Sequence, residues 1–350
     1  MQILWVIPEV RSAHFERSRP VGNLHIIFVS RYKDLDESSI WPSARQVPLA
    51  LAWAWALRGR WQVVHLPEPL WLRALPLTVS VGLTVRLADL FLRRRTRIVT
   101  YAMENNEPTL LMNGIPGFLH RFVFGLIRGL STIIFDRIAF ASSSARECYA
   151  ATRVLPSRCT TALFEDLAAP CMAHRDERKM QQMTFVGVLE LRKGLPDLLA
   201  AWEQANLGAA GWELAIAGSG PLAEDLARAA AADTSITPLG QIDRRKVHEV
   251  MARTAVVVLP SRREGRWREQ IGLSIVEGLS HGCHVIATPD TGLGGWLSRH
   301  GHDVLPENFT VPDLVDALRR AADTRLSPAM VRDSLPPVDG RIAAENWMYQ

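Results

Sequence analysis

From about residue 182 onward, short β-branched runs alternate with longer segments of helical periodicity, and this alternation constrains the fold more than any other feature. The predicted strands are the runs at 183–188, 213–218, 235–240, 255–260, 284–288 and 302–306. The predicted helices lie between them, near 194–206, 220–232, 243–252, 272–281 and 311–323. Alternation of this kind is typical of an α/β fold, in which helices cover both faces of a parallel sheet.

The first half of the chain repeats this pattern with less regular spacing. Its predicted strands are 2–7, 24–29, 61–66, 97–102, 137–142 and 160–164, and its predicted helices lie near 44–58, 70–95, 117–134 and 143–152. The polar stretch 169–182 separates the halves, as a linker between domains does. We therefore expect two Rossmann-like, doubly wound domains, at 1–170 and 180–330, that face each other across a cleft. A C-terminal helix at 331–350 can return to the first domain.

The cysteines and the N-terminus bear on the compartment. The four cysteines, Cys148, Cys159, Cys171 and Cys283, form no C-x-x-C pair, which argues against a disulfide framework or a zinc site and fits a reducing compartment. The apolar start "MQILWVIPEV" is short and lacks a basic n-region, so we expect a buried strand there and not a signal peptide. We expect a cytoplasmic protein.

Positive charge is concentrated in the first half. Residues 1–150 carry a net charge of +7 and the remainder −3, which together give the +4 of the whole chain. Two apolar, arginine-bearing segments lie in this half, at 70–97 and 117–140. Charges interrupt both well before the ~20 apolar residues of a membrane span. Two interpretations remain: core helices of an α/β domain, or partial seating on the anionic inner face of a membrane, as in a peripheral membrane protein.

In open parallel sheets, ligands bind beyond the carboxyl ends of the strands, so the residues after each strand are the candidates for function. After the first strand of the second half comes "GVLELRKG", which begins at Gly187 and ends with Arg192, Lys193 and Gly194. Two cations at the entrance of a helix can hold a pyrophosphate. A solvated surface pair is the competing interpretation.

The next two strand ends give weaker signals. "IAGSGP" contains Gly218 and Gly220, which allow the backbone to approach a ligand or to turn tightly. "LGQI" contains Gln241 and Ile242, whose backbone groups could meet a nucleobase. Each of these motifs is equally typical of an ordinary turn.

The stretch "REQIGLSIVEG" places Glu269 and Glu277 eight positions apart with Gly272 between them. Gly272 opens a predicted helix, and the free N–H groups near Gly272, Leu273 and Ser274 favour an anion. Glu277 lies inside an apolar segment. A buried carboxylate without a partner is costly, so Glu277 either points to water or contacts a partner or a ligand.

Taken together and in this order, the motifs resemble the donor domain of GT-B glycosyltransferases, and within them the retaining family four, the glycosyl transferases group 1. The resemblance is strong over 180–310 and extends over 1–168 only as general architecture. It implies a GT-B fold and a nucleotide diphosphate sugar as donor substrate. It implies no metal ion and no further cofactor.

The same resemblance implies roles for particular residues. Lys193 would hold the diphosphate, with Arg192 beside it. Glu269 would contact the transferred sugar, which makes these three the candidate catalytic residues. Glu277 would bind the nucleotide ribose. The remaining implied donor contacts are Gly187, Gly218, Gly220, Gln241, Ile242, Gly272, Leu273 and Ser274.

The sequence also departs from the family pattern. The family often has an arginine where Val188 stands, and Arg192 is the candidate replacement. The usual Gly-Gly loop after the first strand is absent. Where the family often has a histidine after the strand at 97–102, this chain has Glu104 and Asn105, which with His65 are the acceptor candidates.

The leading interpretation is a hexosyltransferase that builds a cell-envelope glycan or exopolysaccharide on a glycan or lipid-linked acceptor. One alternative is transfer to a soluble natural-product acceptor. Another is a non-catalytic, nucleotide-sugar-binding scaffold, which the missing motifs favour and the retained Lys193, Glu269 and Glu277 disfavour. We expect no nucleic-acid partner.

Overall fold

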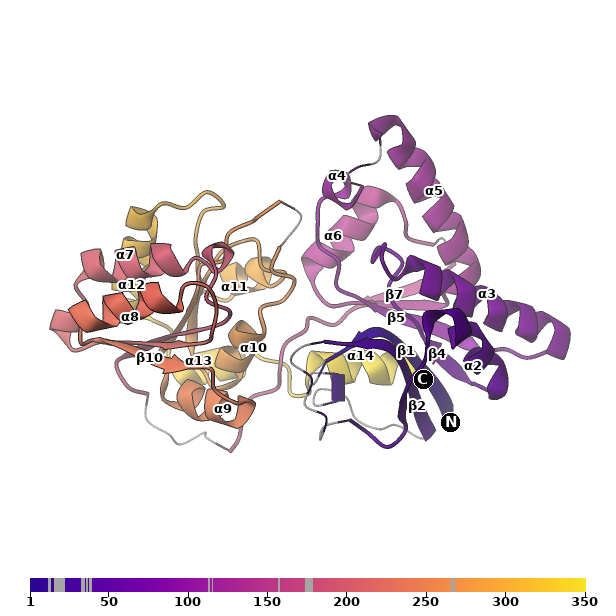
Figure 1. Cartoon of the computed structure of the whole chain (residues 1–350), viewed down its shortest axis with the longest axis horizontal. Helices are drawn as coiled ribbons and strands as arrows, with labels where there is room; N and C mark the ends of the chain where they lie inside the picture. The colour runs from indigo at the N-terminus through magenta and orange to yellow at the C-terminus, as the bar shows by residue number, and fades with distance from the viewer. Residues whose placement is uncertain are drawn as a thin grey trace. The chain divides into compact units, whose positions relative to one another are not determined.

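A computed structural model describes residues 1–11, 14–15, 23–32, 35, 37, 40–112, 114, 116–156, 158–173, 179–265 and 268–350. The chain forms two compact units (Figure 1). The first consists of Met1–Glu165 together with Asp339–Gln350, and the second of Asp166–Val338.

The first unit is built on a seven-stranded parallel sheet with the strand order β3-β2-β1-β4-β5-β6-β7. The strands are β1 Gln2–Val10, β2 Asn23–Arg31, β3 Ala44–Gln46, β4 Val63–His65, β5 Arg97–Ala102, β6 Arg137–Phe140 and β7 Thr160–Leu163. The helices are α2 Ala52–Arg58, α3 Leu75–Leu92, α4 Pro108–Leu111, α5 Gly117–Ile134, α6 Ser143–Thr152 and α14 Gly340–Tyr349. The central strands read as nearly continuous apolar runs because helices cover both faces of such a sheet.

One prediction for this unit was wrong in part. The segment 44–58 does not form a single helix, because Ala44–Gln46 is strand β3 and helix α2 begins only at Ala52. β3 pairs with β2, and the Val47 N–H continues this ladder by donating to the Phe28 carbonyl at 2.8 Å. Pro48, with an extended backbone, then separates the strand from the helical turn.

The C-terminal helix α14 belongs to the first unit. The Asp339 side chain caps it by accepting hydrogen bonds from the N–H groups of Arg341 and Ile342. At its other end, the Tyr349 hydroxyl lies 3.0 Å from His65 Nδ1, at the end of β4. The helix therefore rests against the carboxyl end of a central strand.

The second unit is built on a six-stranded parallel sheet with the order β10-β9-β8-β11-β12-β13. The strands are β8 Gln182–Val186, β9 Glu213–Ala217, β10 Ile236–Gly240, β11 Val256–Leu259, β12 His284–Ala287 and β13 Asp303–Val304. The helices are α7 Leu195–Ala205, α8 Ala223–Ala232, α9 Arg244–Arg253, α10 Leu273–Ser280, α11 Gly294–Arg299, α12 Val311–Thr324 and α13 Pro328–Asp333. Each strand and helix predicted for this half is present, and α11 and α13 were not predicted.

Because the strands of the second sheet are parallel, their carboxyl ends lie along one edge of it. The loops that leave this edge carry "GVLELRKG" after β8, "GSGP" after β9, "QID" after β10 and "REQIG" before α10. The fold of this unit therefore brings the sequence motifs to a common edge.

Candidate functional site

The glycines after β8 and β9 allow two loops of the second unit to pack directly on each other. Gly218 has φ +150°, and a Cβ atom there would lie 1.8 Å from the Gly187 carbonyl oxygen. A Cβ at Gly220 would lie 2.6 Å from the Leu189 carbonyl oxygen. The loops also exchange a hydrogen bond, from Leu189 N–H to the Ser219 carbonyl at 3.0 Å. These glycines thus have a packing role, and their predicted contact with a donor stays a prediction.

Lys193 and Glu269, predicted from separate motifs, meet in the structure. Lys193 ends a short 3₁₀ turn before α7, and its Nζ forms an ion pair with Glu269 Oε2. Only 12% and 15% of the two side chains are exposed. Gly194 next to it has φ +73°, and a Cβ there would lie 2.1 Å from the Pro260 carbonyl oxygen, so only glycine lets the loop after β8 approach the loop after β11.

Arg192 lies beside Lys193 but has a different partner. Its Nε donates to Glu190 Oε2 at 2.5 Å. Its carbonyl accepts a hydrogen bond from Arg262 N–H at 2.7 Å, a second tie between the loops after β8 and β11. Val188, where the family arginine was expected, is exposed. Whether Arg192 serves in its place stays a prediction.

Helix α10 leaves its first two N–H groups without an acceptor among the described residues. Gly272 is its N-cap in the left-handed region at φ +82° and offers no side-chain cap. The Ile275 N–H bonds to the Gly272 carbonyl at 2.9 Å, whereas no described acceptor meets the N–H of Leu273 or Ser274. Such a helix start favours an anion.

The loop after β12 fixes the backbone around Glu269. Gly292 N–H donates to the carbonyls of Glu269 at 3.2 Å and Gln270 at 3.0 Å. Thr291 Oγ1 donates to the Ile271 carbonyl at 2.8 Å. These contacts hold the backbone of the segment that carries Glu269.

Glu277 is buried within α10, and its carboxylate has a protein partner. Arg244 NH2 lies 3.5 Å from Glu277 Oε1. Arg244 is the first residue of α9, two positions after Ile242. The Gln241 side chain is exposed and accepts a hydrogen bond from Ser219 Oγ at 3.2 Å. The sequence analysis missed Arg244, because a basic residue at the start of an amphipathic helix carries no signal of its own.

His65, the first acceptor candidate, is enclosed by its own unit. Its ring stacks on Trp5, with the ring centroids 5.3 Å apart, and its Nδ1 bonds to Tyr349. Burial, together with the positive charge of Arg341, lowers the pKa of His65 to about 3. The imidazole is therefore neutral at physiological pH.

Glu104 and Asn105 follow β5 and are buried. Glu104 Oε1 accepts hydrogen bonds from the Asn106 backbone N–H at 2.9 Å and from Asn106 Nδ2 at 2.8 Å. Both acceptor candidates therefore belong to a hydrogen-bonded strand end, and their contact with an acceptor stays a prediction.

Sequence reasoning missed Glu68, the central group of this strand end. Its buried carboxylate accepts hydrogen bonds from Met103 N–H at 3.0 Å, Glu104 N–H at 3.1 Å and the Tyr149 hydroxyl at 2.9 Å. Burial, and then the negative charge of Glu104, raises the pKa of Glu68 to about 7. Its only signal in the sequence was an acidic residue between two prolines, three positions after His65.

Residues 281–284 read "HGCH", and both histidines have protein partners. His281 Nε2 lies 2.9 Å from His248 Nδ1, and His284 Nε2 lies 2.8 Å from Asp303 Oδ2. Among the described residues, no group of three or more histidine, cysteine or acidic side chains is arranged to hold a metal ion.

Comparisons with known proteins find a family match within the second unit. A family model described as "Glycosyl transferases group 1" matches residues 181–324. The comparison with curated protein sequences found no match.

Solved structures resemble the chain over nearly its whole length. One is the lipopolysaccharide outer core galactosyltransferase WaaB in its apo form (TM-score 0.63, 14% identity, covering 99% of this chain and 98% of that one). A second is Anabaena Alr3699/HepE in complex with UDP and glucose (TM-score 0.61, 12% identity, 100% and 96%). A third is the UDP-forming α,α-trehalose-phosphate synthase from Burkholderia xenovorans with glucose-6-phosphate (TM-score 0.66, 12% identity, 99% of both). At these identities the likeness shows the fold, which is GT-B.

Proposed function

The chain belongs to the glycosyl transferases group 1 family through residues 181–324, and on that premise we propose that it is a retaining, metal-independent hexosyltransferase that uses a nucleotide diphosphate sugar. The observation that carries this proposal is the arrangement around α10. Three features belong to the same unit: the Lys193–Glu269 ion pair, the Arg244–Glu277 ion pair and the N–H groups at the start of α10.

The proposed chemistry follows from the charges. Departure of the leaving group places negative charge on the diphosphate, which Lys193 and the N–H groups of Leu273 and Ser274 stabilise. Glu269 holds the sugar, which passes through an oxocarbenium-like state as in glycoside hydrolysis. The acceptor attacks from the side that the diphosphate leaves, so that the configuration is retained. We assign no side-chain nucleophile.

The nucleotide site is proposed around Glu277. Its carboxylate accepts hydrogen bonds from the ribose hydroxyls, and Arg244 lies beside that carboxylate. The backbone at Gln241 and Ile242 meets the base. Uridine is the first base to test, because Alr3699/HepE, which has this fold, was solved with UDP and with UDP-glucose.

The proposed acceptor is a cell-envelope or extracellular glycan carried on a lipid. Two observations support it: WaaB, a protein of the same fold, is named a lipopolysaccharide outer core galactosyltransferase, and residues 1–150, within the first unit, carry a net charge of +7. Glu104, Asn105 and His65 are the proposed acceptor-positioning residues.

The test is calorimetric binding of UDP, GDP and ADP to the parent protein and to Glu277→Ala. We expect one nucleotide to bind with micromolar affinity and the variant to lose at least tenfold, because it removes a charged hydrogen-bond acceptor worth about 1.5–3 kcal/mol. Glu249→Ala, which changes an exposed carboxylate on α9, is the matched control. If no nucleotide binds the folded parent, the donor site is wrong.

A second measurement separates an enzyme from a scaffold. A transferase should hydrolyse its donor slowly in the absence of acceptor, and Glu269→Gln should abolish this hydrolysis. Nucleotide binding without any donor hydrolysis would favour the scaffold interpretation.

A further inference from the structure

Helix α5 carries apolar side chains on two opposite faces. Its inner face packs into the core of the first unit through Phe124, Ile127 and Ile134. Its outer face exposes Phe118 (82%), Phe122 (70%), Leu126 and Ile133. Residues four positions apart share one face of a helix, so the outer residues form a stripe. A surface helix normally carries polar residues there, and this stripe therefore needs an apolar environment.

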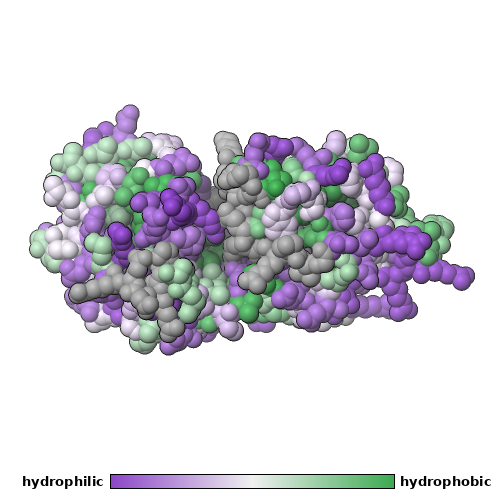
Figure 2. All heavy atoms as spheres, turned by 90° about the horizontal axis from the view of Figure 1, so that it is seen from below, coloured by the Kyte–Doolittle hydropathy of each residue, from purple (hydrophilic) through white to green (hydrophobic). Residues whose placement is uncertain are grey.

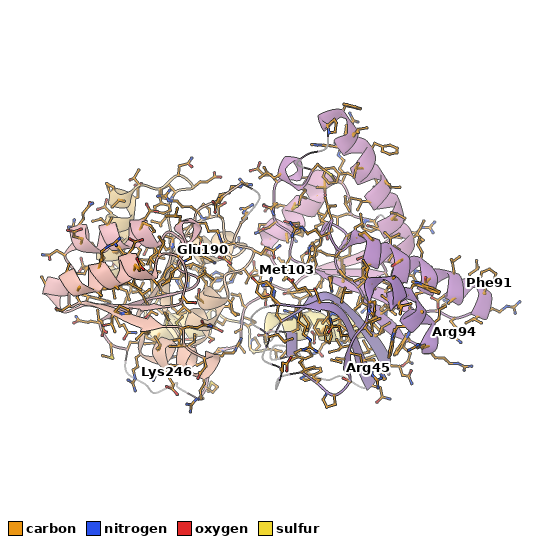
Figure 3. The ribbon with its side chains drawn as sticks, viewed as in Figure 1. Arg45, Phe91, Arg94, Met103, Glu190 and Lys246 are labelled. Carbon is orange, nitrogen blue, oxygen red and sulfur yellow. The ribbon has the colours of Figure 1, made fainter. Side chains whose placement is uncertain are left out.

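Helix α3 has the same two-sided character. Its inner face buries Leu77, Val81 and Val85. Its outer, C-terminal part exposes Leu87, Leu90 (72%), Phe91 (80%) and Leu92. In Figure 3 the labelled Phe91 lies near the C-terminal end of the α3 ribbon. Figure 2 shows hydrophobic and hydrophilic residues side by side on the molecular surface.

Helix α2 enlarges this surface. It packs against α3, and its Trp53 and Leu57 side chains are exposed. We call the exposed apolar residues of α2, α3 and α5 the outer apolar face. Apolar patches larger than a few hundred Å² are uncommon on soluble monomers and mark interaction sites, and the exposed apolar residues along α3 and α5 are candidates for such a patch.

The two long helices are packed into the first unit. Although charged residues interrupt both, their length and mean hydropathy alone would allow them to cross a bilayer. However, Thr78 Oγ1 on α3 donates to the Pro67 carbonyl at 3.0 Å, and Arg86 donates to the Ile133 carbonyl and to Asp136. Extraction would place Arg86 in hydrocarbon, which is costly. The geometry instead fits helices that lie at a membrane interface with one face immersed.

Arginines surround the outer apolar face. Arg93, Arg94 and Arg95 directly follow α3, and Arg121 and Arg128 are exposed on α5. Among the described residues, the guanidinium groups of Arg93, Arg94 and Arg95 have no carboxylate within ion-pair distance. The tip of α3 is therefore both apolar and positively charged.

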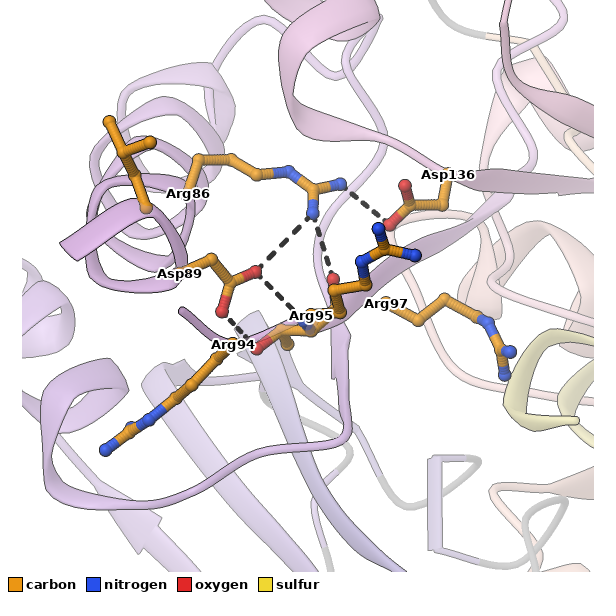
Figure 4. Close-up of a pocket in the computed structure, with 8 residues that line it drawn as sticks. Arg86, Asp89, Arg94, Arg95, Arg97 and Asp136 are labelled. Atoms are coloured by element: carbon orange, nitrogen blue, oxygen red, sulfur yellow. Dashed lines mark hydrogen bonds and ion pairs between the residues drawn. The ribbon is translucent and has the colours of Figure 1, made fainter. Parts of the chain in front are cut away.

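A hollow of about 640 Å³ lies next to this tip (Figure 4). It is lined by Arg86, Asp89, Leu90, Arg94, Arg95, Thr96, Arg97 and Asp136. Arg86 pairs with both aspartates, at 3.7 Å from Asp89 and 2.7 Å from Asp136. In Figure 4 the Arg94 side chain points away from these pairs. The lining thus keeps a net positive charge suited to a phosphate group.

We propose that the outer apolar face and the arginines around it seat the first unit on a bilayer containing anionic phospholipids. The aromatic and leucine side chains enter the boundary between headgroups and acyl chains, and the hollow beside Arg94 and Arg95 receives a headgroup phosphate. A second copy of the chain fits less well, because self-association through this face would bring like charges together. This proposal does not depend on the donor site.

The test is flotation with vesicles of phosphatidylcholine alone and of phosphatidylcholine mixed with phosphatidylglycerol, at low and high salt. We expect binding to the mixed vesicles that weakens with salt. An arginine near an anionic surface strengthens binding roughly fivefold, so the double variant Arg94→Gln/Arg95→Gln should weaken binding roughly 25-fold. The double variant Phe118→Ser/Phe122→Ser should also bind the mixed vesicles more weakly than the parent does. Met330→Ser/Arg228→Gln, which changes exposed residues of the second unit, should bind like the parent.

Three outcomes would overturn the proposal. The parent could fail to bind either vesicle, or the variants could bind as well as the parent. The third is a parent that does not bind vesicles but forms a concentration-dependent dimer, seen by light scattering, which the Phe118→Ser/Phe122→Ser substitutions dissociate. The outer apolar face would then be a self-association surface. Equal thermal unfolding of parent and variants checks that the substitutions leave the fold intact.

Discussion

At the scale of single residues, Lys193 bears most directly on the proposed donor site. Its ammonium group is largely buried and paired with Glu269, and a diphosphate would compete for it. Lys193→Ala should weaken nucleoside diphosphate binding by about 1.5–3 kcal/mol, the worth of a charged hydrogen bond. Titration calorimetry measures this, with the exposed Lys246→Ala as control. If the parent and Lys193→Ala bind the nucleoside diphosphate with equal affinity, Lys193 does not contact the diphosphate.

Glu269 should behave in the opposite way in the same assay. Glu269→Gln removes the negative charge that Lys193 faces, so nucleoside diphosphate affinity should stay the same or rise. Transfer should fall by roughly 100-fold or more, as when a contact that stabilises a transition state is lost. Binding calorimetry and donor turnover together check this. A loss of affinity at unchanged turnover would exchange the proposed roles of Glu269 and Glu277.

Glu68 should make the unfolding free energy of the first unit depend on pH. Its pKa is raised from the ordinary 4.5 to about 7, so the folded chain holds this proton more tightly than the unfolded chain. The stabilisation is complete below pH 4.5 and is lost as the pH rises to about 7, by up to about 3 kcal/mol. Glu68→Gln keeps a neutral acceptor there. The unfolding free energy of this variant, relative to the parent, should therefore rise between pH 4.5 and 7.

Urea unfolding at several pH values measures that difference, and taking the difference cancels the buried histidines, which titrate in the same range. Glu147→Gln, an exposed position on α6, is the control. A pH-independent difference between Glu68→Gln and the parent would show that Glu68 is ionised in the folded chain throughout.

The sequence indicated candidate site residues only where a motif contained them. The order of the motifs indicated Lys193, Glu269 and Glu277, and the structure brings the first two into contact. Arg244 and Glu68 were missed, because their importance lies in which helix or strand end faces them. No local pattern encodes such a contact.

At the scale of elements, α14 depends on contacts with the first unit. Tyr349→Phe removes its hydrogen bond to the buried His65 and should destabilise that unit by about 1–2 kcal/mol. Urea unfolding measures the loss, with the more exposed Tyr32→Phe as control. Nucleoside diphosphate affinity of the folded variant should not change. Unchanged stability would mean that α14 is held by its other contacts, such as Arg97 with the Tyr349 carbonyl.

Elements were predicted best where apolar runs are bounded by glycine. The second half has this pattern, and each strand predicted there is present. The segment 44–58 was wrongly predicted as a single helix because its apolar residues fit a helical period. Strand β3 forms there through non-local pairing with β2. The short helices α11 and α13 have too few residues for a periodic signal.

At the scale of the whole molecule, the two units divide the charge and the proposed tasks. Residues 1–150 carry a net charge of +7 and the remainder −3, and the first unit also carries the outer apolar face. The residues proposed to bind the donor all lie in the second unit. If the division is real, donor binding and membrane binding should be separable by substitution: Arg94→Gln/Arg95→Gln should leave nucleotide affinity intact.

The continuity of the second unit allows a stronger prediction. It is a single stretch of chain, Asp166–Val338, with its own six-stranded sheet and its own buried core. A fragment of residues 166–338 should therefore fold and bind the same nucleoside diphosphate within a few-fold of the whole chain, because Lys193, Arg244 and Glu277 are all present. It should transfer no sugar, since the proposed acceptor residues are missing. Circular dichroism and calorimetry check folding and binding, with the Glu277→Ala fragment as control. A folded fragment that binds no nucleotide would mean that the first unit supplies part of the donor site.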